Sequence, residues 1–304
     1  MRRALVTGAG GFVGAHLLAG LVEGGWTVTA TVRPGSDPHR LRRLDLLSRV
    51  AVESVDLTDP EALGDAVRAA APDVAFCLAA ARAGATALER EGTIAVNTLA
   101  AARVVEALPA QCTRLIALGS STEYAASGSP MDESTPLRPR SFFGATKAAG
   151  SLLLHAAAAR RDLPAVVLRA FQVYGPLDHP GRLVPTVLRA AQDGSVVPLT
   201  AAGRRRDWVW VGDVVTACLL AAEREVSPGQ VLNIGTGTQT TNEDLVTLAR
   251  EVTGRPIPTA PQAHPGRDWD TPSWVCDPAA ARKVLGWVPT MDLRAGLAAC
   301  WSAG

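Results

Sequence analysis

A run of glycines near the start of the chain is the clearest chemical feature of the sequence. It reads Thr7-Gly8-Ala9-Gly10-Gly11-Phe12-Val13-Gly14 and lies between a short apolar segment and a segment of helical periodicity. A helix that begins behind such a turn directs its N-terminal N–H groups at an anion. We therefore predict a dinucleotide site in which Gly8 forms the tight turn, Gly11 lets the pyrophosphate approach and Gly14 allows close helix–strand packing.

The residue that follows the second predicted strand, at 27–32, bears on which dinucleotide binds. An Asp or Glu there would bond to the ribose 2′-hydroxyl and repel a 2′-phosphate. Here the residue is Arg33, and a guanidinium pairs well with phosphate. This favours NADP(H) as cofactor, with NAD(H) as the alternative. The competing interpretation is an exposed arginine that begins a charged segment, because Arg40, Arg42 and Arg43 follow.

The elements that must position these residues alternate regularly over the first 170 residues. Short apolar runs at 3–7, 27–32, 50–55, 74–78, 115–118 and 165–169 are separated by segments of helical period. This alternation predicts an α/β fold with a doubly wound parallel sheet, which binds ligands at its carboxyl edge. Beyond residue 170 the pattern is less regular. We therefore expect a dinucleotide-binding domain at 1–170 and a smaller lobe that takes up most of 171–304. Residues 231–235 are a candidate strand that returns to the main sheet.

Composition excludes several classes of protein. The chain has 304 residues, 30 Lys plus Arg against 29 Asp plus Glu, and a net charge of only +1, which disfavours a nucleic-acid binder. Residues 4–22 lack charged side chains, but their five glycines suit a strand, turn and helix better than a membrane span.

The cysteines and histidines lack the spacing of a metal or disulfide framework. The five cysteines are scattered and form no C-x-x-C pair, and the five histidines share no ligand spacing. We expect no metal, and we expect a reducing, cytoplasmic compartment.

Ordered motifs along nearly the whole chain resemble those of the extended short-chain dehydrogenase/reductases, a group of nucleotide-sugar epimerases, dehydratases and ketoreductases. They include TGAGGFVG at 7–14, DLTD at 56–59, LAA at 78–80, GSSTEY at 119–124, GATK at 144–147, RDWVWVGDV at 206–214 and GRD at 266–268. The resemblance implies a Rossmann-type fold with a C-terminal substrate-binding lobe, a nucleoside-diphosphate sugar as substrate, and a homodimer. It also places Asp56 and Leu57 near the adenine, and Leu78, Ala79 and Ala80 beside the cofactor.

The family's chemistry uses a Tyr-x-x-x-Lys pair beside a Ser or Thr hydroxyl. The lysine holds the nicotinamide ribose and lowers the phenol's pKa, while the hydroxyl bonds the reacting oxygen. By resemblance, Lys147 is the lysine and Ser121 the best match for the hydroxyl, with Ser120 and Thr122 as alternatives because this loop is one residue short.

The tyrosine position holds Phe143, which has no ionisable proton. Loss of such a group typically costs about 10²- to 10⁴-fold in rate. Three interpretations stand: a Tyr was replaced to trap a complex, another group such as Glu123, Thr122 or a water on Ser121 supplies the proton, or catalysis is lost. Glu123 has a second interpretation, as a glutamate that orders its loop.

Resemblance also indicates the substrate contacts, which are Gln172 for the sugar and Arg182, Arg206 and Arg267 for the diphosphate. Arginine suits that role because its planar fork matches phosphate oxygens. The function expected is NADPH-dependent reduction of a 4-keto nucleotide sugar. The alternatives are a 4-epimerase with tightly bound NAD, and a catalytically silent dinucleotide-binding sensor or partner protein.

Overall fold

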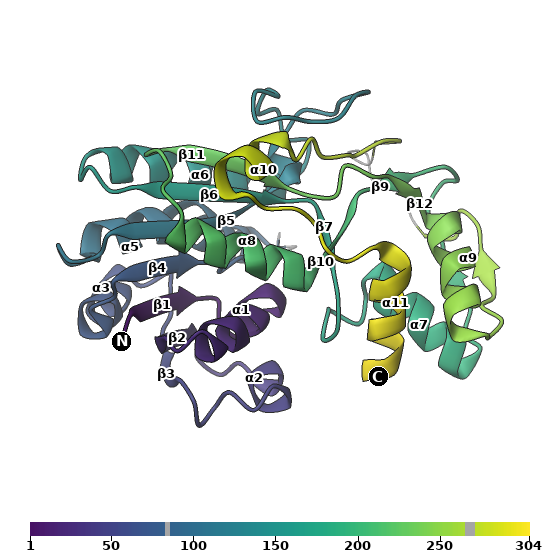
Figure 1. The fold of residues 1–304 in the computed structure, drawn as a ribbon, viewed down its shortest axis with the longest axis horizontal. Helices are drawn as coiled ribbons and strands as arrows, with labels where there is room; N and C mark the ends of the chain where they lie inside the picture. Colours follow the sequence, from purple (N-terminus) through teal and green to yellow (C-terminus); the bar gives the residue numbers. More distant parts are fainter. Residues whose placement is uncertain (83–85, 265–270) are drawn as a thin grey trace.

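The computed structural model describes residues 1–82, 86–264 and 271–304. In this part of the chain, seven parallel strands form one central sheet in the order β11-β6-β5-β4-β1-β2-β3 (Figure 1). The strands are β1 (Arg3–Thr7), β2 (Thr27–Val32), β3 (Ala51–Ser54), β4 (Val74–Cys77), β5 (Arg114–Ser120), β6 (Ala165–Ala170) and β11 (Gln230–Ile234). The predicted α/β class and Rossmann-type doubly wound sheet are confirmed.

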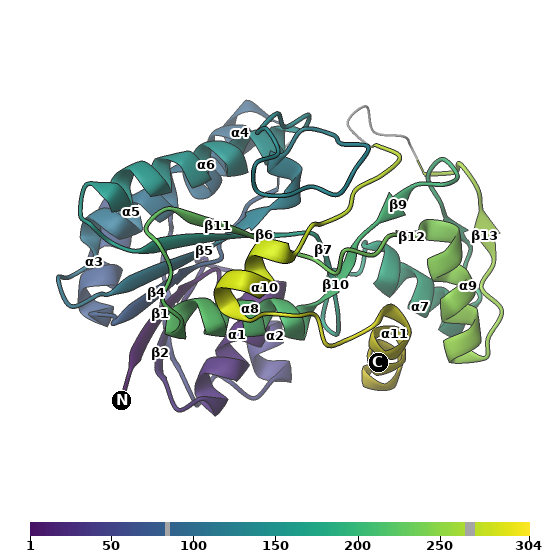
Figure 2. The same ribbon diagram turned by 45° about the horizontal axis from the view of Figure 1, so that its top comes forward.

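Helices cover both faces of this sheet (Figure 2). On one face lie α1 (Phe12–Glu23), α2 (His39–Arg43), α8 (Val211–Glu223) and α10 (Ala279–Leu285). On the other lie α3 (Pro60–Ala70), α4 (Ala87–Ile94), the π-helical turn η1 (Ala95–Leu99), α5 (Ala100–Ala107) and α6 (Phe142–Ala159). Each crossover between parallel strands is right-handed, so the side of the sheet on which its helix lies depends on the direction in which the chain moves along the sheet. The strand order changes direction between β1 and β4, so the helices on either side diverge there and leave an opening at the carboxyl edge.

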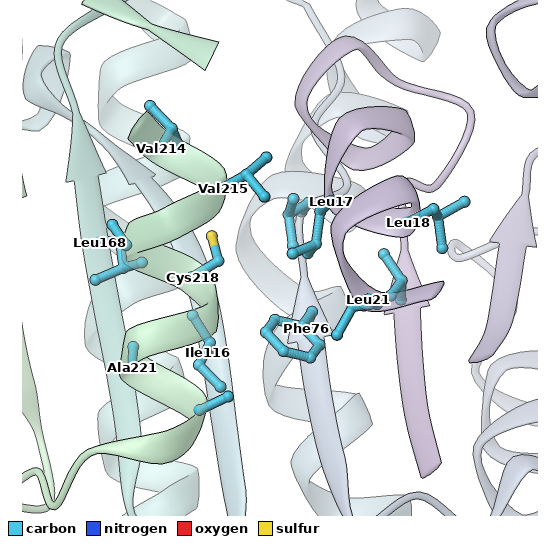
Figure 3. Close-up of a cluster of buried hydrophobic side chains, with 14 of the residues drawn as sticks. Leu17, Leu18, Leu21, Phe76, Ile116, Leu168, Val214, Val215, Cys218 and Ala221 are labelled. Atoms are coloured by element: carbon cyan, nitrogen blue, oxygen red, sulfur yellow. The ribbon is translucent and has the colours of Figure 1, made fainter. Parts of the chain in front are cut away.

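The apolar face of α1 explains why this helix packs where it does. Leu17 and Leu21 are fully buried against Phe76 of β4, and Val214 and Cys218 of α8 complete the cluster (Figure 3). Each such side chain contributes on the order of 1.5–3 kcal/mol by leaving water. The packing fixes the start of α1, and with it the glycine turn, relative to the sheet.

Most of the C-terminal third forms a second lobe with its own apolar core. It is built from the helices α7 (Leu183–Asp193), α9 (Asn242–Thr253) and α11 (Leu293–Ala303). Short strand pairs complete it: β7 (Gln172–Tyr174) with β10 (Trp208–Trp210), β9 (Arg205–Arg206) with β12 (Thr240–Thr241), and β8 (Val197–Pro198) with β13 (Thr259–Ala260). Between these segments the chain returns to the sheet as α8, β11 and α10 (Figures 1 and 2).

None of the described helices combines the length and the apolar character that crossing a membrane would require.

Candidate active site

The glycine turn joins β1 to α1 at the carboxyl edge of the sheet. Gly8 has φ +73°, a left-handed conformation that favours glycine, and a Cβ there would lie 2.5 Å from the Ala79 nitrogen. A Cβ on Gly14 would lie 2.2 Å from the Gly8 carbonyl oxygen, so helix and turn approach closely only because both residues are glycine. This explains why Leu78–Ala80, the segment after β4, runs directly beside the turn.

The N-terminus of α1 is suited to an anion. Gly11 is its N-cap and provides no side-chain hydrogen bond, and the first turn, which starts with Phe12 and Val13, contains no acidic residue. The first N–H groups of the helix therefore lack a side-chain acceptor, and the helix dipole favours negative charge at this end. These features fit the pyrophosphate of a dinucleotide.

Arg33 and Asp56 follow the neighbouring strands β2 and β3, so both lie at the same edge of the sheet. Both side chains are exposed, whereas Leu57 is half-buried. Hydrogen bonds from the Thr58 N–H and hydroxyl lower the pKa of Asp56, and the charge of Arg33 adds to this effect. Arg33 thus presents an exposed cation where an acidic residue would select the ribose 2′-hydroxyl.

Lys147 projects from α6 to the end of β5. Its Nζ donates a 2.5 Å hydrogen bond to the Leu118 carbonyl oxygen. It also lines a cavity of about 30 Å³, together with Thr7 at the end of β1 and Ala79 beside the glycine turn. Burial lowers the pKa of the ammonium, while the charges of Glu123 and Cys77 partly oppose that shift. The structure therefore brings Lys147 next to the predicted dinucleotide site.

Helix α6 is held in this position by close backbone approach. A Cβ on Gly150 would lie 2.1 Å from the Asn97 carbonyl oxygen, and one on Gly144 would lie 2.2 Å from the Thr122 carbonyl oxygen. Asn97 also donates to Thr146 Oγ1 at 3.0 Å. The first contact fixes the helix against η1, and the second places half-buried Phe143 next to the turn that bears the hydroxyl candidates.

That turn is the 3₁₀ helix η2 (Ser121–Glu123), which directly follows β5. Ser121 is buried, and its Oγ accepts a 2.8 Å hydrogen bond from Trp274 Nε1. Ser120 Oγ and Thr122 Oγ1 lie 2.8 Å apart and bond to each other. Of the three candidate hydroxyls, Ser121 is therefore the one that contacts the segment after residue 270.

Glu123 lies in the interior below this turn, with both carboxylate oxygens occupied. Oε1 accepts from the Ser120 N–H at 2.8 Å, and Oε2 accepts from Arg169 Nε at 2.8 Å and Ser151 Oγ at 3.0 Å. Its side chain has no solvent exposure. This placement favours the loop-ordering interpretation over a proton donor, since an acid that reaches substrate needs a free oxygen in the cleft.

Both tyrosines are buried in packing positions, so neither supplies the missing phenol. Tyr124 donates a 2.7 Å hydrogen bond to Asn233 Oδ1, and burial raises its pKa to about 12. Tyr174 packs edge-on against Trp208 and Trp210, and burial raises its pKa as well. The indoles of Trp208 and Trp210 serve the lobe's core.

The predicted substrate residues gather around β7 and β9. Gln172 begins β7, where its N–H donates to the Asp207 carbonyl oxygen at 3.0 Å. Arg182 caps α7 and donates to the Val173 carbonyl oxygen at 3.4 Å. Arg206, in β9, donates to the Thr271 carbonyl oxygen at 3.0 Å, and burial lowers its pKa to about 10. Arg267 lies outside the described residues.

Sequence reasoning missed Trp274 and the Glu123–Arg169–Ser151 cluster. The contact of Trp274 with Ser121 joins residues 153 apart in the sequence, and no local motif indicates it. Arg169 and Ser151 lie in an apolar strand and an alanine-rich helix. A charged residue in such a strand is the signal that could have indicated a buried partner.

Known proteins share this architecture over nearly the full chain. The dTDP-6-deoxy-L-talose 4-dehydrogenase (NAD(P)(+)) of Kitasatospora kifunensis is 31% identical, covering 99% of this chain and 95% of its own. The UDP-glucose 4-epimerase of Mycolicibacterium smegmatis is 30% identical, covering 97% and 96%. The solved structure of MoeE5 in complex with UDP-glucuronic acid and NAD superposes with a TM-score of 0.85 at 33% identity, covering 97% and 96%.

The family itself follows from a match over most of the chain. Residues 4–235, which include the glycine turn, η2, Lys147 and Arg206, match the model of the NAD dependent epimerase/dehydratase family. The members just described are epimerases and dehydrogenases of nucleotide sugars. The chain therefore belongs to the NAD dependent epimerase/dehydratase family, and it is an enzyme of the extended short-chain dehydrogenase/reductase type.

Proposed function

We propose that the protein reduces the 4-keto group of a nucleoside-diphosphate sugar with NADPH. The observation that supports this most directly is one small cavity whose wall includes Thr7, Ala79 and Lys147. Residues beside the dinucleotide turn and on the lysine-bearing helix thus lie together at one edge of the sheet. A bound nicotinamide would supply a hydride there; the residues of the chain must orient the carbonyl and provide a proton.

The choice of NADPH rests on Arg33. Its exposed guanidinium follows β2, and the nearby Asp56 carboxylate is already bonded to Thr58. A 2′-phosphate would pair with the guanidinium there, whereas no acidic side chain directly follows β2 to favour the 2′-hydroxyl. The Kitasatospora relative, named for use of either coenzyme, is consistent with such a site.

At the reacting carbon, Ser121 would donate a hydrogen bond to the carbonyl oxygen and Lys147 would hold the nicotinamide ribose. Phe143 leaves no phenol, and the oxygens of Glu123 are occupied. We assign the proton to a water held by Ser121, which solvent reprotonates, with Thr122 as the nearest alternative. The oxygen gains this proton as the carbon gains the hydride, so the keto group becomes a hydroxyl.

Gln172, Arg182 and Arg206 would hold the nucleotide sugar. With a pKa of about 10, Arg206 remains a cation at neutral pH despite its burial. A buried guanidinium binds phosphate more strongly than an exposed one because water competes less. The Kitasatospora relative supports this substrate class, since dehydrogenation at position 4 and 4-keto reduction are one reaction in opposite directions.

We also propose a cytoplasmic homodimer. All five cysteines are unpaired and buried, which suits a reducing compartment. Exposed apolar side chains lie on adjacent helices, with Leu88 and Ile94 on α4 and Leu152 and Leu153 on α6. Such a surface is typical of a subunit contact.

A second candidate is 4-epimerisation with tightly held NAD, favoured by the Mycolicibacterium relative. The two activities are separated by offering UDP- and dTDP-linked 4-keto sugars and their 4-hydroxy counterparts, with NADPH and NADH. We expect one NADPH oxidised per 4-keto sugar reduced. Inversion of a 4-hydroxy sugar without net change in coenzyme absorbance would support the epimerase. If both the wild type and Phe143→Tyr bind the cofactor but turn over no sugar, this would support the third alternative, a catalytically silent dinucleotide-binding sensor or partner protein.

A further inference from the structure

We propose that Trp274 is a positioning residue that sets the direction of the Ser121 hydroxyl. This inference rests on the proposed function in one respect, that Ser121 faces the reacting carbonyl. The indole contacts the serine directly, with Nε1 2.8 Å from Oγ. No motif of the family resemblance includes this contact, and Trp274 lies outside the segment 4–235 that matches the family model.

The chemistry of the two groups gives the bond a fixed direction. An indole N–H can only donate, whereas a serine hydroxyl has one proton and two lone pairs. Ser121 must therefore accept from Trp274, and its own proton stays available for another acceptor. A carbonyl oxygen of the substrate can only accept, so the indole preorganises the hydroxyl in the donor orientation that a keto sugar requires.

The neighbouring hydroxyls do not compete for this role. Ser120 and Thr122 bond to each other, and the Thr122 N–H also donates to Ser120 Oγ at 3.2 Å. Ser121 is buried, and the Trp274 indole donates to its Oγ directly. The indole N–H is thus the group that decides where the Ser121 proton points.

The backbone around Trp274 is rigidly held, so the indole cannot drift from the serine without a larger rearrangement. The Trp274 carbonyl oxygen accepts from the Asp207 N–H at 3.1 Å, and the Pro272 carbonyl oxygen accepts from the Arg205 N–H at 2.9 Å. On the other side, the Val275 carbonyl oxygen accepts from the Met131 N–H at 2.9 Å. Residues 272–275 therefore form a fixed bridge between the lobe and the turn at Ser121.

The same bridge begins at an expected diphosphate contact. Arg206 donates to the Thr271 carbonyl oxygen, three residues before Trp274.

The absence of a phenol at 143 increases the importance of this orientation. In a Tyr-containing site, a second hydroxyl could bond to the reacting oxygen. With Phe143 that second donor is missing, so the correctly oriented Ser121 O–H is the main protein group able to polarise the carbonyl.

Kinetics of Trp274→Phe test the proposal, because phenylalanine retains an aromatic ring and removes the N–H. We expect kcat on the preferred keto sugar to fall about 3- to 10-fold, as for loss of one hydrogen bond, with KM for coenzyme unchanged. Trp301→Phe, the same substitution on α11, should leave kcat unchanged. In a Ser121→Ala background, Trp274→Phe should cause no further loss. An equal fractional loss in both backgrounds would overturn the proposal, because the indole would then act independently of Ser121.

A spectroscopic measurement tests the contact even if no keto sugar is turned over. With ¹⁵N-tryptophan in the whole protein, the Trp274 indole resonance is the one that disappears in Trp274→Phe. Ser121→Ala should shift that resonance upfield and speed its exchange with solvent, leaving the Trp301 indole unchanged. An unaltered Trp274 signal would refute the hydrogen bond and with it the positioning role. Absence of turnover together with the expected shift would refute only the proposed function.

Discussion

The Glu123 carboxylate accepts a 2.8 Å hydrogen bond from Arg169 Nε, and neither side chain is more than 5% exposed. Arg169 also lies over the Tyr124 ring, with 4.6 Å between the guanidinium carbon and the ring centroid. Through Ser120 and Ser151, Glu123 joins the end of β5 to α6. This ion pair therefore holds the hydroxyl turn and the lysine helix in a fixed relation.

Glu123→Ala should strongly destabilise the fold, because it leaves the Arg169 charge buried without its partner. We expect the free energy of unfolding to fall by about 3–5 kcal/mol. Urea denaturation followed by circular dichroism measures this. The matched control is Asp65→Ala, which removes an exposed partner of Arg68 and should cost less than about 1 kcal/mol. Similar losses for the two variants would contradict the structural role of Glu123.

Phe143→Tyr should raise the rate of keto-sugar reduction, because it restores an acid one helical turn from Lys147. Gains of about 10²- to 10⁴-fold are typical of a positioned acid–base group. Steady-state kcat measures the change, with Phe142→Tyr as the control on the exposed side of the same turn. An unchanged kcat in Phe143→Tyr would contradict this prediction, because a phenol at 143 would then not reach the reacting oxygen.

Arg33→Ala should weaken NADPH binding and leave NADH binding nearly unchanged, since only NADPH has a 2′-phosphate. Loss of a charge-assisted hydrogen bond corresponds to about 10- to 100-fold in Kd. Fluorescence titration of each coenzyme measures both constants, and Arg49→Ala provides an exposed control. If Arg33→Ala weakens the binding of NADPH and NADH equally, Arg33 does not contact the 2′-phosphate.

The value of kcat/KM for coenzyme should decline at alkaline pH because Lys147 loses its proton there. Its pKa is lowered chiefly by burial, so the ammonium loses its proton below the range of about 10.4 usual for lysine. Since the charged form holds the ribose, kcat/KM for coenzyme should fall as pH rises through this value. Lys147→Arg keeps its charge to pH 12 or above, so its alkaline decline should move upward whatever its maximal rate. An unchanged decline would mean that another group titrates.

The sequence predicted the sheet well because its strands are short, continuous apolar runs bounded by turn residues. The predicted limits 3–7 and 27–32 agree with β1 and β2, and 50–55 and 165–169 agree with β3 and β6 within one residue at each end. Burial of a parallel sheet on both faces produces this pattern. Local periodicity is therefore enough to predict these elements.

The contacts across the site could not be predicted in this way. Ser121 and Trp274 are 153 positions apart, and Glu123 and Arg169 are 46 apart. Neither pair shares a helix face or a strand register, so local spacing has no information about it. Likewise, an α-helix at 211–223 does not by itself show that α8 packs against α1 on the sheet, since many apolar helices would fit the second lobe equally well.

Transfer of deuterium from NADPH labelled on the reactive face at nicotinamide C4 is the most direct test of the proposed reduction. With a nucleotide-linked 4-keto sugar and the whole protein, we expect deuterium at sugar C4 and one NADP⁺ formed per sugar, measured by NMR and mass spectrometry. Product without label from either labelled face, or sugar conversion with NADPH unconsumed, would contradict the account.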